Sequence, residues 1–152
     1  MTEKNVVKVL VPAGALGIPY DKDALAKGLT FKPDLIAIDG GSTDSGPFYL
    51  GTGTSKYSRS STKSDWGELM AARAKIGVPL LIGTAGTCGT NSTVDWLVDI
   101  TKEIASERHE TLTIAVLKSD QSAANINGSA ALERMHPLEG APAITSEIIE
   151  DC

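Results

Sequence analysis

Four short runs of apolar residues, separated by longer polar stretches, set the pattern of this chain. The last three runs contain almost no polar residue. Strands that are buried on both faces of a parallel sheet have this composition. The four expected strands are Val6–Val11, Leu35–Ile38, Leu80–Ile82 and Leu112–Leu117.

Three segments between these runs are predicted to be helices. They are Asp21–Lys27, Ser64–Ile76 and Ser92–Arg108, and the last has apolar residues on one helical face and acids on the opposite face. Ser92 with Asp95 fits a capping box at the start of that helix. Gly77 stands where the preceding helix is expected to end.

The alternation of strand and helix predicts an α/β fold. Right-handed crossovers then give a parallel sheet of about four strands with flanking helices, in a single domain over residues 1–152. A last helix begins at Thr145 and is cut after about two turns. We therefore expect the N-terminal portion of a longer architecture with an incomplete sheet, which forms a homo-oligomer or pairs with a second polypeptide.

The connections that leave the strands are long and rich in glycine and hydroxyl residues, whereas those that enter the strands are short. This asymmetry indicates a functional site at the C-terminal ends of the strands. Insertions that the fold merely tolerates are the alternative. The long connections are Pro12–Tyr20, Asp39–Lys63, Gly83–Asn91 and Lys118–Gly128.

The connection after the second strand carries the best candidates for chemistry. Asp39 and Asp44 are the expected catalytic acid or base, and the residues between them are expected to contact substrate: Gly40, Gly41, Ser42 and Thr43. An aspartate after a strand also serves as a turn former. Two carboxylates could hold Mg²⁺, but with no third carboxylate nearby the sequence assigns no metal site.

A second loop, Gly86-Thr87-Cys88-Gly89, precedes the third predicted helix. Backbone amides at such a helix start attract phosphate or carboxylate, so these four residues are expected to bind an anionic group. Cys88 is either a nucleophile activated by the helix terminus or a small buried residue in a tight turn.

Three cations are candidates for binding an anionic substrate, namely Lys56, Arg59 and Lys118. Ordinary solvated cations are the alternative. His136 lies far from any predicted strand end and is interpreted as structural.

Charge and composition narrow the class of protein. The 152 residues carry a net charge of −5 with no basic cluster, so nucleic acid is not an expected partner. Charged residues near the start and the lack of a long apolar run predict no membrane contact and a cytoplasmic location. The two cysteines and two histidines lack the spacing of a zinc site or disulfide framework.

Several segments resemble the N-terminal domain of the acyclic terpene utilisation family. The most specific is Asp39–Leu50, with supporting segments at Val11–Gly14, Lys32–Asp34, Val78–Gly86 and His136–Leu138. The resemblance covers nearly the whole chain, and family members are about three times as long. It implies a soluble protein in the catabolism of terpenoid or other carboxylic acids and acyl-CoA thioesters, with CoA as part of the substrate.

The leading hypothesis is part of a catabolic enzyme with hydratase, lyase or isomerase chemistry on a small carboxylic acid or acyl-CoA. Asp39 would handle the proton, and the Gly86–Gly89 loop would hold an anionic group. A nucleotide-phosphate-binding protein and a non-catalytic subunit of a larger complex are the alternatives.

Overall fold

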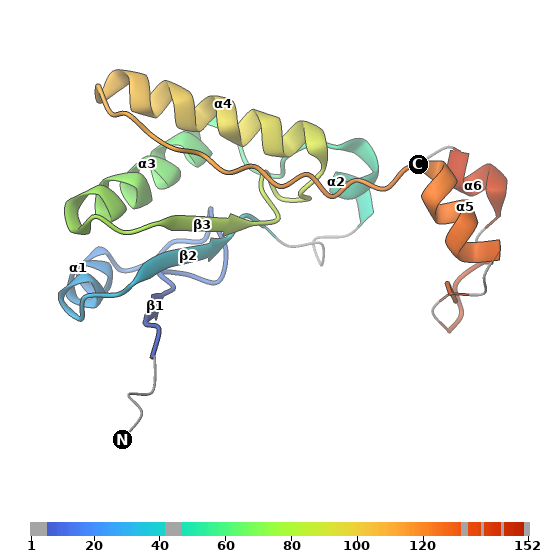
Figure 1. The fold of residues 1–152 in the computed structure, drawn as a ribbon, viewed down its shortest axis with the longest axis horizontal. Helices are drawn as coiled ribbons and strands as arrows, with labels where there is room; N and C mark the ends of the chain where they lie inside the picture. Colours follow the sequence, from blue (N-terminus) through green and yellow to red (C-terminus); the bar gives the residue numbers. More distant parts are fainter. Residues whose placement is uncertain (1–5, 42–46, 132–133, 138, 144, 151–152) are drawn as a thin grey trace. The chain divides into compact units, whose positions relative to one another are not determined.

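A computed structural model describes residues 6–41, 47–131, 134–137, 139–143 and 145–150. The chain divides into two compact units, Met1–Lys118 and Ser119–Cys152. The first unit has an α/β fold with a parallel sheet, as the sequence predicts (Figure 1). Its elements are β1 (Val9–Leu10), α1 (Lys22–Thr30), β2 (Leu35–Asp39), α2 (Pro47–Thr52), α3 (Arg59–Ile76), β3 (Leu80–Gly83) and α4 (Asn91–Glu107).

The sheet is open and has the strand order β1-β2-β3, with both pairs parallel. Ile36 at the centre of the sheet is in register with Leu10 on one side and Leu80 on the other. Residues in register point to the same face, so these three side chains share one face of the sheet.

Helices α1 and α3 cover that same face. Gly28 of α1 packs so closely on Leu10 that a Cβ atom there would lie 2.6 Å from the leucine Cδ1 atom. The core behind the sheet brings α3 and α4 against Ile38, and it is built from Leu16, Ile38, Trp66, Leu69, Met70, Ala85, Leu97, Ile100 and Ile104. Right-handed crossovers from β1 to β2 and from β2 to β3 place α1 and α3 on one side of the sheet.

The opposite face of the sheet is exposed, so the prediction of strands buried on both faces is wrong for the described residues. Val9 is 50% exposed and Leu81 is 61% exposed. The prediction failed because the strands are apolar at nearly every position, which is typical of a sheet that is covered on both faces. No described element of the first unit covers this apolar face.

The helix ends agree with local capping chemistry, with one correction. Asp21 caps α1, and Gly77 ends α3 in the left-handed conformation at φ 71°. Helix α4 begins at Asn91 after Thr90, whose side chain accepts from the Thr93 amide. The capping box predicted at Ser92 is therefore wrong by two residues, because the extended backbone of Thr90 lets its hydroxyl reach the helix amides.

Residues 112–117 form no strand, so the prediction of a fourth strand is wrong. The segment is tied to the helical layer at both ends: the Glu110 amide donates to the Ala105 carbonyl, and Lys118 pairs with Asp95 of α4. Between these anchors only Leu112 packs against the core, and Leu117 is 86% exposed. The contacts with α4 hold the ends of the segment, and no ladder with β3 forms.

The second unit contains α5 (Ala123–Ala131) and α6 (Ser146–Glu150). The short helix predicted after Thr145 is confirmed, and the Thr145 hydroxyl accepts from the Ile148 amide at 3.3 Å. Ile149 is buried while Ile148 is 45% exposed. Among the described residues, none of the helices has the length and apolar character needed to cross a membrane.

Leu69 is the position at which we expect the first unit to be most sensitive to truncation. Its side chain is fully buried between α3 and the sheet. The substitution Leu69→Ala should lower the free energy of unfolding by about 2–5 kcal/mol, measured by urea denaturation. Leu50→Ala in α2, where the side chain is 52% exposed, is the control and should cost under about 1 kcal/mol. Equal losses would contradict this account of the core.

Candidate functional site

The connections after β2 and β3 meet at the C-terminal edge of the sheet. Asp39 and Gly83, the last residues of the two strands, are in register, and the Gly40 amide donates to the Gly83 carbonyl at 2.6 Å. A Cβ atom on Gly41 would lie 2.4 Å from the Cα atom of Thr87. The two backbones therefore touch, and the side-chain-free glycines make this approach possible.

The connection after β1 joins the same edge. The Leu16 amide donates to the Asp39 carbonyl at 2.7 Å. Gly17 packs beneath the ring of Tyr57, which would lie 2.9 Å from a Cβ atom at that glycine. The predicted convergence is thus confirmed for the loops after β1, β2 and β3. No fourth strand forms, and Lys118 pairs with Asp95 near the start of α4.

The Asp39 side chain is exposed, and one oxygen of its carboxylate is oriented by the following turn. Its Oδ1 accepts from the Gly41 amide at 3.0 Å. This bond is that of a turn former, and it also fixes the direction of an accessible carboxylate at a strand end. Asp44, Ser42 and Thr43 lie outside the described residues.

The Gly86–Gly89 loop is a compact turn that leads into α4. Three of its residues have positive φ angles, namely Gly86 at 70°, Thr87 at 84° and Gly89 at 70°. Gly86 packs against Thr93, where a Cβ atom would lie 2.5 Å from the threonine Cβ. The turn thus sits directly against the first turn of α4, where peptide dipoles favour an anion.

Thr87 supports a neighbouring loop with its side chain. It is 1% exposed, and its Oγ1 accepts from the Lys56 amide at 3.1 Å and lies 3.3 Å from Ser55 Oγ. Thr87 therefore positions the segment between α2 and α3. Sequence reasoning assigned no role to Ser55 or to Gly17, because hydroxyl residues and glycines are too common in that loop and the first one for a single position to stand out.

Cys88 combines the two properties that the sequence left as alternatives. The side chain is 8% exposed, which fits a small residue in a tight turn. Burial raises the pKa of the thiol, but the Thr90 amide and the Thr93 and Thr90 hydroxyls outweigh it and hold the pKa below its ordinary value. The sulfur lies 3.5 Å from Thr93 Oγ1.

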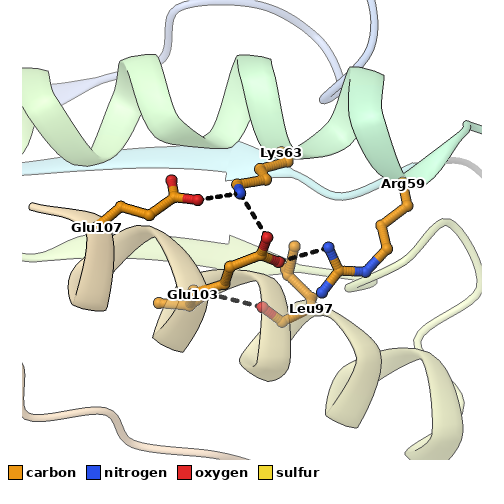
Figure 2. Close-up of polar contacts among 6 residues, drawn as sticks. Arg59, Lys63, Leu97, Glu103 and Glu107 are labelled. Carbon is orange, nitrogen blue, oxygen red and sulfur yellow. Dashed lines mark hydrogen bonds and ion pairs between the residues drawn. The ribbon is translucent and has the colours of Figure 1, made fainter.

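Two of the three candidate cations are engaged with acids of α4. Arg59 and Lys63 of α3 both pair with Glu103 at 2.6 Å, and Lys63 also pairs with Glu107 (Figure 2). Lys118 pairs with Asp95 at 2.6 Å. Lys56 places its Nζ atom 6.0 Å from the centroid of the Tyr57 ring, on the same edge of the sheet as Asp39.

Other parts of the chain contribute little to this edge. No cluster of three metal-ligating side chains occurs within the described residues. His136 is exposed. A shallow cavity of about 440 Å³ lies at the far end of α4, lined by Ala71, Ala74, Arg108, His109 and Glu110. It lies away from the Asp39 edge, since Arg108 and His109 follow the C-terminus of α4.

Comparison with known proteins gives no relative. No protein-family model matches the chain, and neither the curated proteins nor the solved structures contain a match.

The contact between Gly41 and Thr87 should not tolerate a methyl group. We expect Gly41→Ala to lower the free energy of unfolding by about 2 kcal/mol or more, because the new Cβ meets backbone and the φ angle of 153° disfavours a side chain. Urea denaturation measures the loss. Gly51→Ala, at a helical glycine with open space around it, is the control and should be neutral or stabilising. An unchanged Gly41→Ala variant would show that the two loops separate easily.

Proposed function

We propose that the edge formed by the three loops is the active site of an enzyme that moves a proton on a small carboxylic acid or its CoA thioester. The observation that carries the proposal is the position of Asp39. Its exposed carboxylate stands at the end of β2 and is oriented by the Gly41 amide, and Gly41 in turn packs on Thr87 of the turn that leads into α4. A base next to an anion-attracting helix terminus suits this chemistry.

In this mechanism the Asp39 carboxylate accepts the proton from the carbon next to the substrate carbonyl. The electron pair of the broken C–H bond moves onto the carbonyl oxygen and gives an enolate. Amides of the Gly86–Gly89 turn and the first turn of α4 would stabilise that negative charge. Return of the proton to another position gives isomerisation, and loss of a β-substituent gives elimination.

The wider setting belongs to the same proposal. We propose a cytoplasmic catabolic role within an acyclic terpene utilisation type of protein, on the strength of the Asp39–Leu50 segment and its neighbours. Binding of a nucleotide phosphate is the second candidate, because the glycine-rich turn at the start of α4 would also suit a phosphate.

A ligand panel separates these two candidates. The full chain is heated with short branched carboxylic acids, with their CoA thioesters, and with ATP and ADP, each with and without Mg²⁺. A ligand that prefers the native state raises the melting temperature. Stabilisation by the acids or thioesters supports the proposal. Stabilisation by the nucleotides alone would overturn it in favour of phosphate binding.

The role of Asp39 is tested by exchange of a substrate proton with solvent. In D₂O, NMR follows deuterium incorporation at the carbon next to the carbonyl of the ligand that binds. Asp39→Asn should slow this exchange by about two orders of magnitude or more, because the amide cannot act as the base. The melting temperature should change little, since the asparagine oxygen can still accept from the Gly41 amide.

Asp99→Asn is the matched control for this experiment. Asp99 is an exposed aspartate on α4 whose partner, Lys102, is 3.8 Å away, so its replacement should leave exchange unchanged. An Asp39→Asn variant with wild-type exchange would leave Asp39 as a turn former only.

A further inference from the structure

The uncovered face of the sheet is a continuous apolar surface. Here it is called the open face, defined as Val9, Val11, Leu35, Ala37 and Leu81. The register places Val9 beside Leu35 and Ala37 beside Leu81, so the side chains form adjacent rows. Three members are half or more exposed: Val9 at 50%, Val11 at 58% and Leu81 at 61%.

The sequence of the strands shows that this face has the composition of a covered one. A strand with one solvated face alternates apolar and polar residues, whereas Leu35 to Ile38 and Leu80 to Ile82 are apolar at every position. None of the five members of the open face carries a charge or a polar side chain. Exposure of such an apolar surface to water costs free energy, and burial beneath another apolar layer removes this cost.

We propose that a second copy of this chain covers the open face, sheet against sheet, in a symmetric dimer. A two-fold contact needs a surface that is complementary to itself. The five apolar side chains of the open face meet this condition, because sheets pack face to face about 10 Å apart through interdigitating apolar side chains, and the Asp39 carboxylate lies only at the end of the β2 row. The net charge of −5 does not oppose the contact directly, because no ionisable side chain lies among the five residues.

The size of the surface agrees with a weak dimer. Each Val or Leu buries on the order of 100 Å². The open face, together with the 65% exposed Val7 just before β1, therefore supplies about 400–500 Å² on each copy. A pair would bury about 800–1,000 Å², which at most reaches the lower limit for a specific interface. Association should accordingly depend on concentration.

Sedimentation equilibrium of the full chain tests the proposal. From about 10 to about 500 µM, a range that spans weak association, the average mass should rise from one chain toward two. Leu81→Glu should raise the concentration of half-association at least about tenfold, because a charge would be buried at the contact. Val9→Lys introduces a charge into the same contact from β1 and should weaken association in the same way. It replaces Leu81→Glu in the test if circular dichroism and melting show that Leu81→Glu is poorly folded.

Leu117→Glu is the matched control. Leu117 is 86% exposed in the segment tied to α4, so a charge there leaves the open face unaltered and should leave association unchanged. A wild-type chain that stays monomeric throughout would overturn the proposal. A loss of association in Leu117→Glu equal to that in Leu81→Glu would also overturn it, because the contact would then not be specific to the open face.

Discussion

The close approach of two backbones at the end of the sheet is the constraint on which the candidate site depends. Gly40 and Gly41 lie against the Thr84–Thr87 backbone at distances that leave no room for a Cβ atom. Because of this contact, the residues that follow β2 and those that precede α4 are placed relative to one another by backbone atoms. Positions set in this way are more precise than those set by long side chains, which is what the proposed proton transfer needs.

The one-sided sheet follows from the order of the strands. In the order β1-β2-β3 each crossover moves to the next neighbour in the same direction, and right-handed connections then place α1 and α3 on one face. The charges between α3 and α4 lie on the outer side of that layer, where Lys63 bridges two glutamates of α4 (Figure 2). Exposed pairs of this kind add little to stability, so the apolar core holds the layers together.

The sequence predicted those parts of the molecule that depend on local chemistry. The core strands, the three main helices and the convergence of their loops followed from apolar runs, caps and glycines. Residues 112–117 were misassigned because their composition suits a strand, whereas their placement depends on ladder bonds with β3 and on the Lys118–Asp95 pair. The ion pair between Arg59 and Glu103 could not be predicted either, because the two residues are far apart in the sequence.

Asp39 links the candidate site to the open face. Alternate residues of β2 point to the same side of the sheet, so Asp39 shares the side of Leu35 and Ala37 and ends that row. A layer seated on the open face would therefore lie beside the carboxylate and displace water from one side of it. Exclusion of water strengthens electrostatic interactions with a developing charge. The apolar face and the catalytic proposal are thus physically connected through a single strand, although each rests on its own observation.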